Sequence, residues 1–509
     1  MKVFWRACTF TVIALVAFGS AYFLVSEDED RAVEVSLAPP EPINPVVFTP
    51  FSDEPTAVGR ARLAEDLRAM ADVRPGYPFW QHVFKLPDGH VAYGSSQDGR
   101  LLAVFPTGGD WPGDAQWYDS SLPPLLAGAN LHPRLSIRRD QVSDRLEIRA
   151  GPVIHNMTRG DFLAPNVERY GAFVGEWGRI FERFGVPAEV GLAQAIVESG
   201  LNGRVRSEAD ALGLCQWLRG NWERIRSLHP HEVEAFNQTT QAPFCAAYLT
   251  ILATKYHSFI PALSEHHAGG TNVGRVLING VRLGAEDSRT QYLVGSHFAR
   301  ELRQLPGRGY QAVVRSYGPR SYLYSEMVFG NIYTAGEIVR DVSQARVYAM
   351  RANRDLPLGE LARVTNLSER EIKRFNPALV NQVPEGATVY LPRHLEGLGE
   401  DVAFWRHPPA DAFVSVLDDF LKLDLSLGQW YGSSGRRTIE LYRTRFLDTD
   451  TEEGQAMATM LAYVAQEMFS GARSEILARY ERDPDVIRLV SEGLWALGGH
   501  PSVLRVNAP

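Results

Sequence analysis

The sequence is poor in cysteine, has no excess of positive charge, and lacks the short motifs that bind phosphate or metal. Only 3 of its 509 residues are cysteine, and 52 Lys and Arg face 60 Asp and Glu, for a formal net charge of −8. This balance excludes the basic footprint of a nucleic-acid-binding protein, so we expect no nucleic-acid partner. The chain also has no phosphate-binding glycine loop, no zinc-type Cys/His spacing and no low-complexity tract.

The few cysteines leave one disulfide to consider. Cys8 lies in an N-terminal apolar segment, whereas Cys215 and Cys245 both fall in the middle of the chain. An exported protein oxidises such a pair to a disulfide. The alternative is that both are small buried hydrophobic side chains. The sequence does not give the distance between them, so both interpretations stay open.

The first thirty residues carry the charge pattern of an export signal or a membrane anchor. Lys2 and Arg6 precede an apolar run from Cys8 to Val25, and an acidic cluster follows it. This order predicts a cytoplasmic N-terminus and export of the rest of the chain. The run is longer than a signal-peptide core of roughly 7 to 15 residues and approaches the ~20 that span a bilayer. We expect residues 1–30 to be an uncleaved anchor in the inner membrane, although residues 19–21 offer a cleavage site.

The length predicts roughly two to four domains behind this segment. Residues 31–55 are rich in proline, which predicts an extended linker rather than a helix or a central strand. Residues 56–150 change to short alternating apolar runs separated by tight turns, which predicts a small mixed α/β module of unknown role. We expect one helix at 56–71 and strands at 82–86, 90–94 and 101–105 and around Leu146 and Ile148.

Residues 151–340 contain the most informative stretch. Apolar residues at helical spacing predict helices over 166–184 and 243–256, with a loop at 266–274 between later elements. Between the first two, Pro187 to Ser199 reads as a short buried helix, because proline suits the first turn.

Glu198 lies in the last turn of that short helix, on a face shared with Gln194 and Ala195. The helix dipole disfavours an anion at a C-terminus by up to ~1 kcal/mol, and partial burial raises a carboxyl pKa in the same direction. A carboxyl group kept protonated near neutrality suits general acid catalysis of glycosidic-bond cleavage. The alternative for the residue alone is a surface glutamate at a frayed helix end.

The surroundings of Glu198 form a recognisable pattern. Glu198-Ser199, then a polar loop, then Gly213-Leu214-Cys215-Gln216, resembles the catalytic domain of soluble-type lytic transglycosylases. In that family an Ala-Tyr-Asn-Ala-Gly segment follows, and here residues 265–269 read Glu-His-His-Ala-Gly. The resemblance covers about residues 166–330. It implies a goose-lysozyme-like α+β fold and cleavage of peptidoglycan glycan strands.

The resemblance also implies roles for particular residues. Glu198 is the single acid and base, so neither a metal nor an organic cofactor is expected. Ser199 hydrogen-bonds near the acid, and Gln216 binds an N-acetyl group of the substrate through its amide. The family's late tyrosine is Tyr324 or Tyr292; Tyr324 follows a Pro-Arg-Ser segment and is the closer match. If it is Tyr324, the stretch between the two tyrosines is an insertion that covers part of the groove.

His266 and His267 depart from the family pattern, which has Tyr-Asn at these positions. A histidine can donate the hydrogen bond that the family asparagine gives to the substrate or the acid. A charged histidine beside Glu198 would instead lower the pKa of the acid. Adjacent residues in a loop do not aim at one metal ion, so the pair predicts substrate binding rather than a metal site.

Two further units follow. Residues 345–393 show a strand–helix–helix–strand order, with Asn376 after the second helix and a Pro-x-Gly turn before the last strand. This order resembles a LysM module, which binds glycans that contain N-acetylglucosamine; whether this copy binds them stays open. Residues 400–509 predict a helical C-terminal domain, with Met457, Met460 and Leu461 on one apolar face. That face suits core packing or contact with a protein partner in the envelope.

Together these features predict a multidomain, mainly α protein. A lysozyme-like α+β catalytic domain is preceded by a small β-containing module and followed by a LysM-like βααβ module and a helical C-terminal domain. The leading hypothesis is a periplasmic lytic transglycosylase anchored in the inner membrane. It resembles the membrane-bound type D enzymes in pairing the catalytic domain with LysM, although no lipoprotein signal precedes Cys8. A non-catalytic peptidoglycan-binding scaffold and a hydrolytic muramidase are the alternatives.

Overall fold

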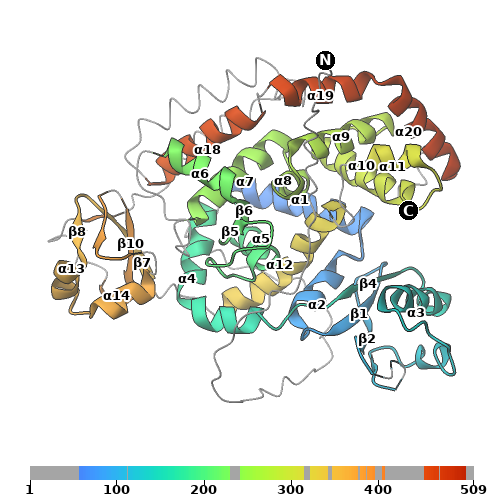
Figure 1. Ribbon diagram of the computed structural model, residues 1–509, viewed down its shortest axis with the longest axis horizontal. Helices are drawn as coiled ribbons and strands as arrows, with labels where there is room; N and C mark the ends of the chain where they lie inside the picture. The colour runs from blue at the N-terminus through green and yellow to red at the C-terminus, as the bar shows by residue number, and fades with distance from the viewer. Residues whose placement is uncertain are drawn as a thin grey trace, which may run out of the picture.

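Figure 1 shows a computed structural model of the chain. The structure describes residues 57–109, 111, 113–229, 241–314, 321–341, 347–376, 379–385, 387–395, 404–406, 452–468 and 471–499. The predicted membrane segment, the proline-rich linker and residues 407–451 of the predicted C-terminal domain lie outside these ranges. None of the helices that the structure describes is long and apolar enough to cross a bilayer.

Helices make up most of the described residues, and the strands gather in four small sheets. The α-helices are α1 (Ala57–Val73), α2 (Trp80–Lys85), α3 (Leu135–Ala150), α4 (Leu163–Arg183), α5 (Ala188–Ser199), α6 (Arg219–Leu228), α7 (Ala242–Tyr256), α8 (Phe259–Ala268), α9 (Gly270–Arg282), α10 (Ser288–Leu302), α11 (Arg308–Val314), α12 (Tyr324–Asp341), α13 (Leu358–Thr365), α14 (Glu369–Phe375), α18 (Glu452–Met468), α19 (Gly471–Arg482) and α20 (Pro484–Ala496). Short 3₁₀ turns are η1 (Tyr77–Phe79), η2 (Pro123–Leu125), η3 (Ser321–Leu323) and η4 (Arg393–Leu395). The strands are β1 (His90–Ser95), β2 (Leu101–Pro106), β3 (Gln116–Trp117), β4 (Val153–Met157), β5 (Ala211–Leu212), β6 (Trp217–Leu218), β7 (Val347–Ala352), β8 (Leu356–Pro357), β9 (Gln382–Val383), β10 (Thr388–Pro392) and β11 (Phe404–Arg406).

The N-terminal sheet is antiparallel with the order β3-β2-β1-β4, and α3 packs against it (Figure 1). The strand expected around Leu146 and Ile148 is wrong, because these residues belong to α3. Val142, Leu146 and Ala150 recur one helical turn apart and are buried against the sheet, while Ile148 points outward and is 76% exposed. A single exposed isoleucine between charged residues imitates the alternation of a strand.

The first helices do not belong to the sheet's own core. The strand expected at 82–86 is also wrong, since Val83 and Phe84 lie in α2. Side chains of α1, η1 and α2, such as Met70 and Trp80, are buried in the main hydrophobic core together with α12. The sheet, by contrast, takes β4 from beyond residue 150. The small module is therefore centred on residues 90–157 rather than on 56–150.

The main core surrounds α5, a helix that is buried on nearly every side. It packs along α12 and against α4, and α7 and α8 in turn pack against α4 and α12. Its residues are small or apolar, as in Gly191, Ala193 and Ala195, which allows the neighbouring helices to approach closely. A Cβ on Gly191 would lie 2.3 Å from the ring of Phe181 on α4. The helix that carries Glu198 is thus held rigidly from several directions.

The described C-terminal helices share cores with helices of residues 163–314 instead of forming a separate one. Met457, Met460, Leu461 and Val464 of α18 are each at most 2% exposed and pack on α6 and α7. Further along, α19 lies against α9 and α20 against α11 (Figure 1). The methionine stripe therefore serves packing within this chain.

Residues 347–395 form a small unit at one side of the molecule (Figure 1). The elements follow the order β7, α13, α14, β10, and β7 pairs antiparallel with β10. Asn376 explains why an asparagine stands after the second helix. It is fully buried, its amide donates to the Tyr390 carbonyl at 2.7 Å, and its oxygen accepts from the Tyr390 N–H at 2.7 Å. This side chain satisfies the backbone of the last strand, a structural role.

Candidate active site

The site begins where α5 ends. Gly200 adopts a left-handed conformation (φ 58°) as the C-cap and donates its N–H to the Ile196 carbonyl at 3.0 Å. A Cβ on Gly200 would lie 2.1 Å from the ring of Phe162, so only glycine fits. The abrupt end leaves Glu198 in the last turn, 13% exposed, at the edge of the core.

The loop after α5 folds back as a short hairpin, β5 and β6, and is fastened at two points. Gly213 turns with φ 74°, and the Leu214 N–H that follows donates to the buried amide oxygen of Gln241. One residue on, Cys215 is joined by a disulfide to Cys245 of α7, with the two Cα atoms 6.2 Å apart. The loop that carries the family motif is therefore anchored to α7.

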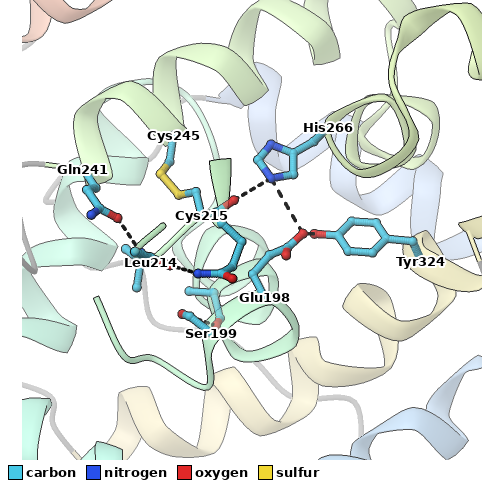
Figure 2. Close-up of a disulfide and its surroundings, with 11 residues drawn as sticks. Glu198, Ser199, Leu214, Cys215, Gln241, Cys245, His266 and Tyr324 are labelled. Atoms are coloured by element: carbon cyan, nitrogen blue, oxygen red, sulfur yellow. Dashed lines mark hydrogen bonds and ion pairs between the residues drawn. A yellow bond between two sulfur atoms is a disulfide. The ribbon is translucent and has the colours of Figure 1, made fainter. Parts of the chain in front are cut away.

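Two side chains from distant parts of the chain converge on Glu198 (Figure 2). The Tyr324 hydroxyl, at the N-terminus of α12, donates to Oε1 of Glu198 at 2.5 Å. His266, in the last turn of α8, places Nε2 3.7 Å from the same oxygen. The same Nε2 lies 2.9 Å from the Cys215 carbonyl oxygen. Both partners are almost fully buried, so the carboxyl group faces a largely apolar, water-poor environment.

Burial raises the pKa of Glu198 to about 7, although the Tyr324 hydrogen bond opposes this by favouring the anion. Near neutral pH a substantial fraction of the carboxyl group is therefore protonated. The pKa of Tyr324 itself is raised well above 10 by burial, so its hydroxyl remains a donor. This combination gives an acid that can lose and regain a proton close to neutrality.

The two histidines lie in a helix and not in the expected loop, because α8 continues through Ala268 before Gly269 ends it with φ 81°. Burial lowers the pKa of both His266 and His267 to about 4, so both are neutral near pH 7. His267 stacks on Tyr324 with ring centroids 4.4 Å apart and an interplanar angle of 6°. Neither histidine therefore carries the charge that would depress the pKa of Glu198.

The remaining candidate residues take different positions. Ser199 donates its hydroxyl to the Ala195 carbonyl at 2.9 Å, within its own helix, and makes no hydrogen bond to Glu198. Gln216 stands in the motif loop with φ 51°, and its amide nitrogen donates to Gly213 O at 2.8 Å. Of the two tyrosine candidates, Tyr324 contacts Glu198, whereas Tyr292 is buried on α10. The helices α10 and α11, in the stretch between the two tyrosines, pack with α20 in a separate apolar cluster.

Nearby carboxylates are already paired. Asp210 bonds Arg206 at 2.6 Å and Arg219 at 2.7 Å, and these contacts lower its pKa. Glu265, buried one residue before His266, pairs with Lys255 at 2.6 Å. Glu208, two residues before Asp210 in the motif loop, is exposed and forms no ion pair among the described residues. Within the described residues, no three His, Cys, Asp or Glu side chains gather as a metal site would require.

Sequence reasoning missed several residues that shape the site. Gln241 holds the motif loop, and Trp217 and Tyr248 face the His266 ring with centroids 6.1 Å and 5.8 Å away. Gln194, 1% exposed and one turn before Glu198, hydrogen-bonds Tyr324. Of these residues, only Gln194 could have been found from the sequence, because it shares the helix face of Glu198. The positions of the others depend on tertiary contacts.

Comparison with known families agrees with this arrangement. Residues 177–282 match the family model described as the transglycosylase SLT domain. The match spans the end of α4 through α9 and includes Glu198, the motif loop and both histidines, but not Tyr324. No curated protein matches the chain. The SLT domain indicates an enzyme of the lytic transglycosylase type, which degrades peptidoglycan.

Proposed function

We propose that this protein is a peptidoglycan lytic transglycosylase with Glu198 as its acid and base. The bond cleaved is the β-1,4 linkage from N-acetylmuramic acid to N-acetylglucosamine, and the product ends in 1,6-anhydro-N-acetylmuramic acid. The observation that carries the proposal is the buried Glu198, with a pKa of about 7 and a hydrogen bond from Tyr324, inside the SLT match. A carboxyl group in this state can donate a proton and take one back at the same pH.

The reaction needs one carboxyl group. Glu198 first protonates the leaving glycosidic oxygen, and the substrate's own N-acetyl group stabilises the sugar cation. Glu198, now a carboxylate, then removes the proton from the muramic acid 6-hydroxyl, which attacks C1, and no water is consumed. Enzymes that use two carboxyl groups hold them roughly 5 to 9.5 Å apart. Glu189, Asp210 and Glu265 are engaged in ion pairs and Glu208 is exposed, which favours the one-carboxylate route.

The other matched residues support the substrate and the acid. Gln216 uses its amide nitrogen within the loop, and its oxygen accepts no hydrogen bond from the described residues, so it is available to an acetamido N–H. Ser199 braces the last turn of α5 through Ala195, and His267 holds the ring of Tyr324 by stacking. Residues 345–393 supply a second, LysM-like contact with the glycan strands. The N-terminal segment anchors the enzyme in the inner membrane, with the catalytic part in the periplasm.

The test is mass spectrometry of purified peptidoglycan after incubation with the full chain in detergent, beside Glu198→Gln. We expect anhydromuropeptides from the wild type and none from the variant. Products heavier by one water, also absent with the variant, would instead establish a muramidase. If both proteins bind the glycan and neither releases product, the chain is a scaffold and the proposal fails.

A further inference from the structure

His266 stands between two hydrogen-bond acceptors. Its Nε2 is 2.9 Å from the Cys215 carbonyl oxygen and 3.7 Å from Oε1 of Glu198 (Figure 2). A carbonyl oxygen can only accept, so Nε2 must carry the hydrogen of this neutral imidazole. The donor is thus bonded to Cys215, while Glu198 lies less than 1 Å beyond ordinary hydrogen-bond distance.

The charge on Glu198 decides which acceptor is better. A protonated carboxyl oxygen competes poorly with a backbone carbonyl, whereas hydrogen bonds to a carboxylate are roughly twice as strong as neutral ones. The other groups that bear on this carboxyl are the Tyr324 hydroxyl from α12, and His267 from α8, which is neutral and stacked on Tyr324. No Lys or Arg of the described residues forms an ion pair with Glu198. When Glu198 becomes an anion, His266 supplies a second donor close to the carboxylate, 3.7 Å from Oε1.

A change of acceptor requires only a small displacement of Nε2, because both oxygens lie within 3.7 Å of it. Trp217 and Tyr248 contact the ring and each other in a three-ring cluster, and Tyr248 in turn packs against Tyr463 of α18, with ring centroids 6.0 Å apart. The Cys215 carbonyl oxygen, which accepts from Nε2 in this structure, is also held in place, because Cys215 is disulfide-bonded to α7. The ring can therefore pivot between two acceptors whose positions are fixed.

We propose that His266 is a positioning residue that transfers its Nε2–H hydrogen bond from Cys215 to Glu198 once Glu198 has given up its proton. The inference rests on the proposed function of Glu198. No proton moves to or from the imidazole: the proton leaves Glu198 for the glycosidic oxygen and returns to Glu198 from the 6-hydroxyl. His266 holds the carboxylate during the interval and returns to Cys215 when the carboxyl group is reprotonated.

The test compares pH profiles of anhydromuropeptide release by the full chain. His266→Phe keeps a flat ring in contact with Trp217 and Tyr248 but removes the donor, whereas His266→Gln keeps an N–H. For His266→Phe we expect kcat about tenfold lower and the alkaline limb of kcat/KM moved up by about one pH unit, because the anion loses one charge-assisted hydrogen bond. His266→Gln should restore the limb to near the wild-type pH.

The inference is overturned if a folded, active His266→Phe protein has the alkaline limb of kcat/KM at the wild-type pH. It is also overturned if the limb moves equally in His266→Phe and His266→Gln, because that result would indicate an effect of packing alone. Should His266→Phe fail to fold, ¹⁵N-histidine NMR of the wild type gives the answer. The His266 Nε2–H signal must then move with the ionisation of Glu198 while the ring stays neutral, and a signal that does not move contradicts the exchange. If Glu198→Gln releases the same products as the wild type in the digestion experiment, the proposed function is contradicted, whatever the His266 variants show.

Discussion

The surroundings of Glu198 disfavour the charged form of its carboxyl group. Its carboxyl group is at the C-terminus of α5, where the helix dipole disfavours an anion, and the surrounding protein removes most of its water. One hydrogen bond from Tyr324 offsets part of this cost, which leaves the pKa near 7 instead of near 4.5. A charged carboxylate at this position therefore lowers the stability of the folded protein.

Glu198→Gln should make the protein more stable at high pH. Because the folded-state pKa is raised from 4.5 to about 7, the folded wild type loses stability as pH rises through this window. The neutral amide has no such loss, so the variant should gain up to about 3 kcal/mol in free energy of unfolding above pH 8, and nothing below pH 4. Denaturant unfolding at both pH values measures this. A gain of equal size at pH 4 would contradict the origin in ionisation.

Tyr324→Phe should raise the pKa of Glu198 further. The hydroxyl donates to the carboxyl oxygen and favours its charged form, so its loss moves the alkaline limb of kcat/KM to higher pH. The phenylalanine ring keeps the stack with His267. Tyr292→Phe, which alters a buried tyrosine on α10, should leave the limb unchanged. The pH dependence of product release separates the two.

At this scale the position of Glu198 at a helix end predicted the direction of its pKa shift, whereas its role as the acid was inferred from the family resemblance and stays a prediction. It did not decide between Tyr324 and Tyr292, because the choice depends on how α12 packs along α5. It also did not reveal that the two histidines are neutral. That property follows from the depth of burial, which no local pattern contains.

At the scale of elements, the end of α5 and the motif loop fix the site. Proline and glycine patterns predicted α5 and its end correctly, since both act through local backbone geometry. The strands expected at 82–86 and near Leu146 were helices, because short apolar runs suit either period until tertiary packing decides. The end of α8 was expected to be a loop for a similar reason: the double glycine at 269–270 lies between two helices and not within a longer turn.

Gly200→Ala should destabilise the protein by about 2 kcal/mol or more. The residue has φ 58° and its Cβ would meet the Phe162 ring at 2.1 Å, so strain and a steric clash add. Gly220→Ala is the matched control, because a Cβ there meets nothing within 4 Å and Gly220 lies in α6. Thermal unfolding of both variants tests this. Similar melting temperatures for the two would show that the end of α5 is not constrained as described.

At the scale of the whole molecule, the main hydrophobic core is built from helices that lie far apart in the sequence. Residues of α1 and α2 from the N-terminal side and of α18 from the C-terminal side are buried in one cluster around α5. The sequence predicted the helices and the apolar face of α18. It did not predict which helices they pack against, because an apolar stripe shows that a helix face is buried but not which element buries it.

Met460→Ala should therefore weaken the catalytic core itself. Met460 is fully buried between α18 and the core, and its truncation should lower the free energy of unfolding by about 2 to 4 kcal/mol. Ile476→Ala on α19, which is 42% exposed, should cost well under 1 kcal/mol. Unfolding followed at once by tryptophan fluorescence and by loss of activity measures the effect. A Met460→Ala protein that loses α18 while the core unfolds as in the wild type would contradict a shared core.

The packing of α18 on α6 and α7 also has a consequence for folding during translation. The apolar surface that α18 covers belongs to α6 and α7, which are made well before the helix itself, and domains otherwise tend to fold in order as the chain emerges. A chain that is cut short during translation has the acid, the motif loop and both histidines, yet lacks the helix that completes their support. Completion of the core around the proposed site is thus postponed until α18 has been made.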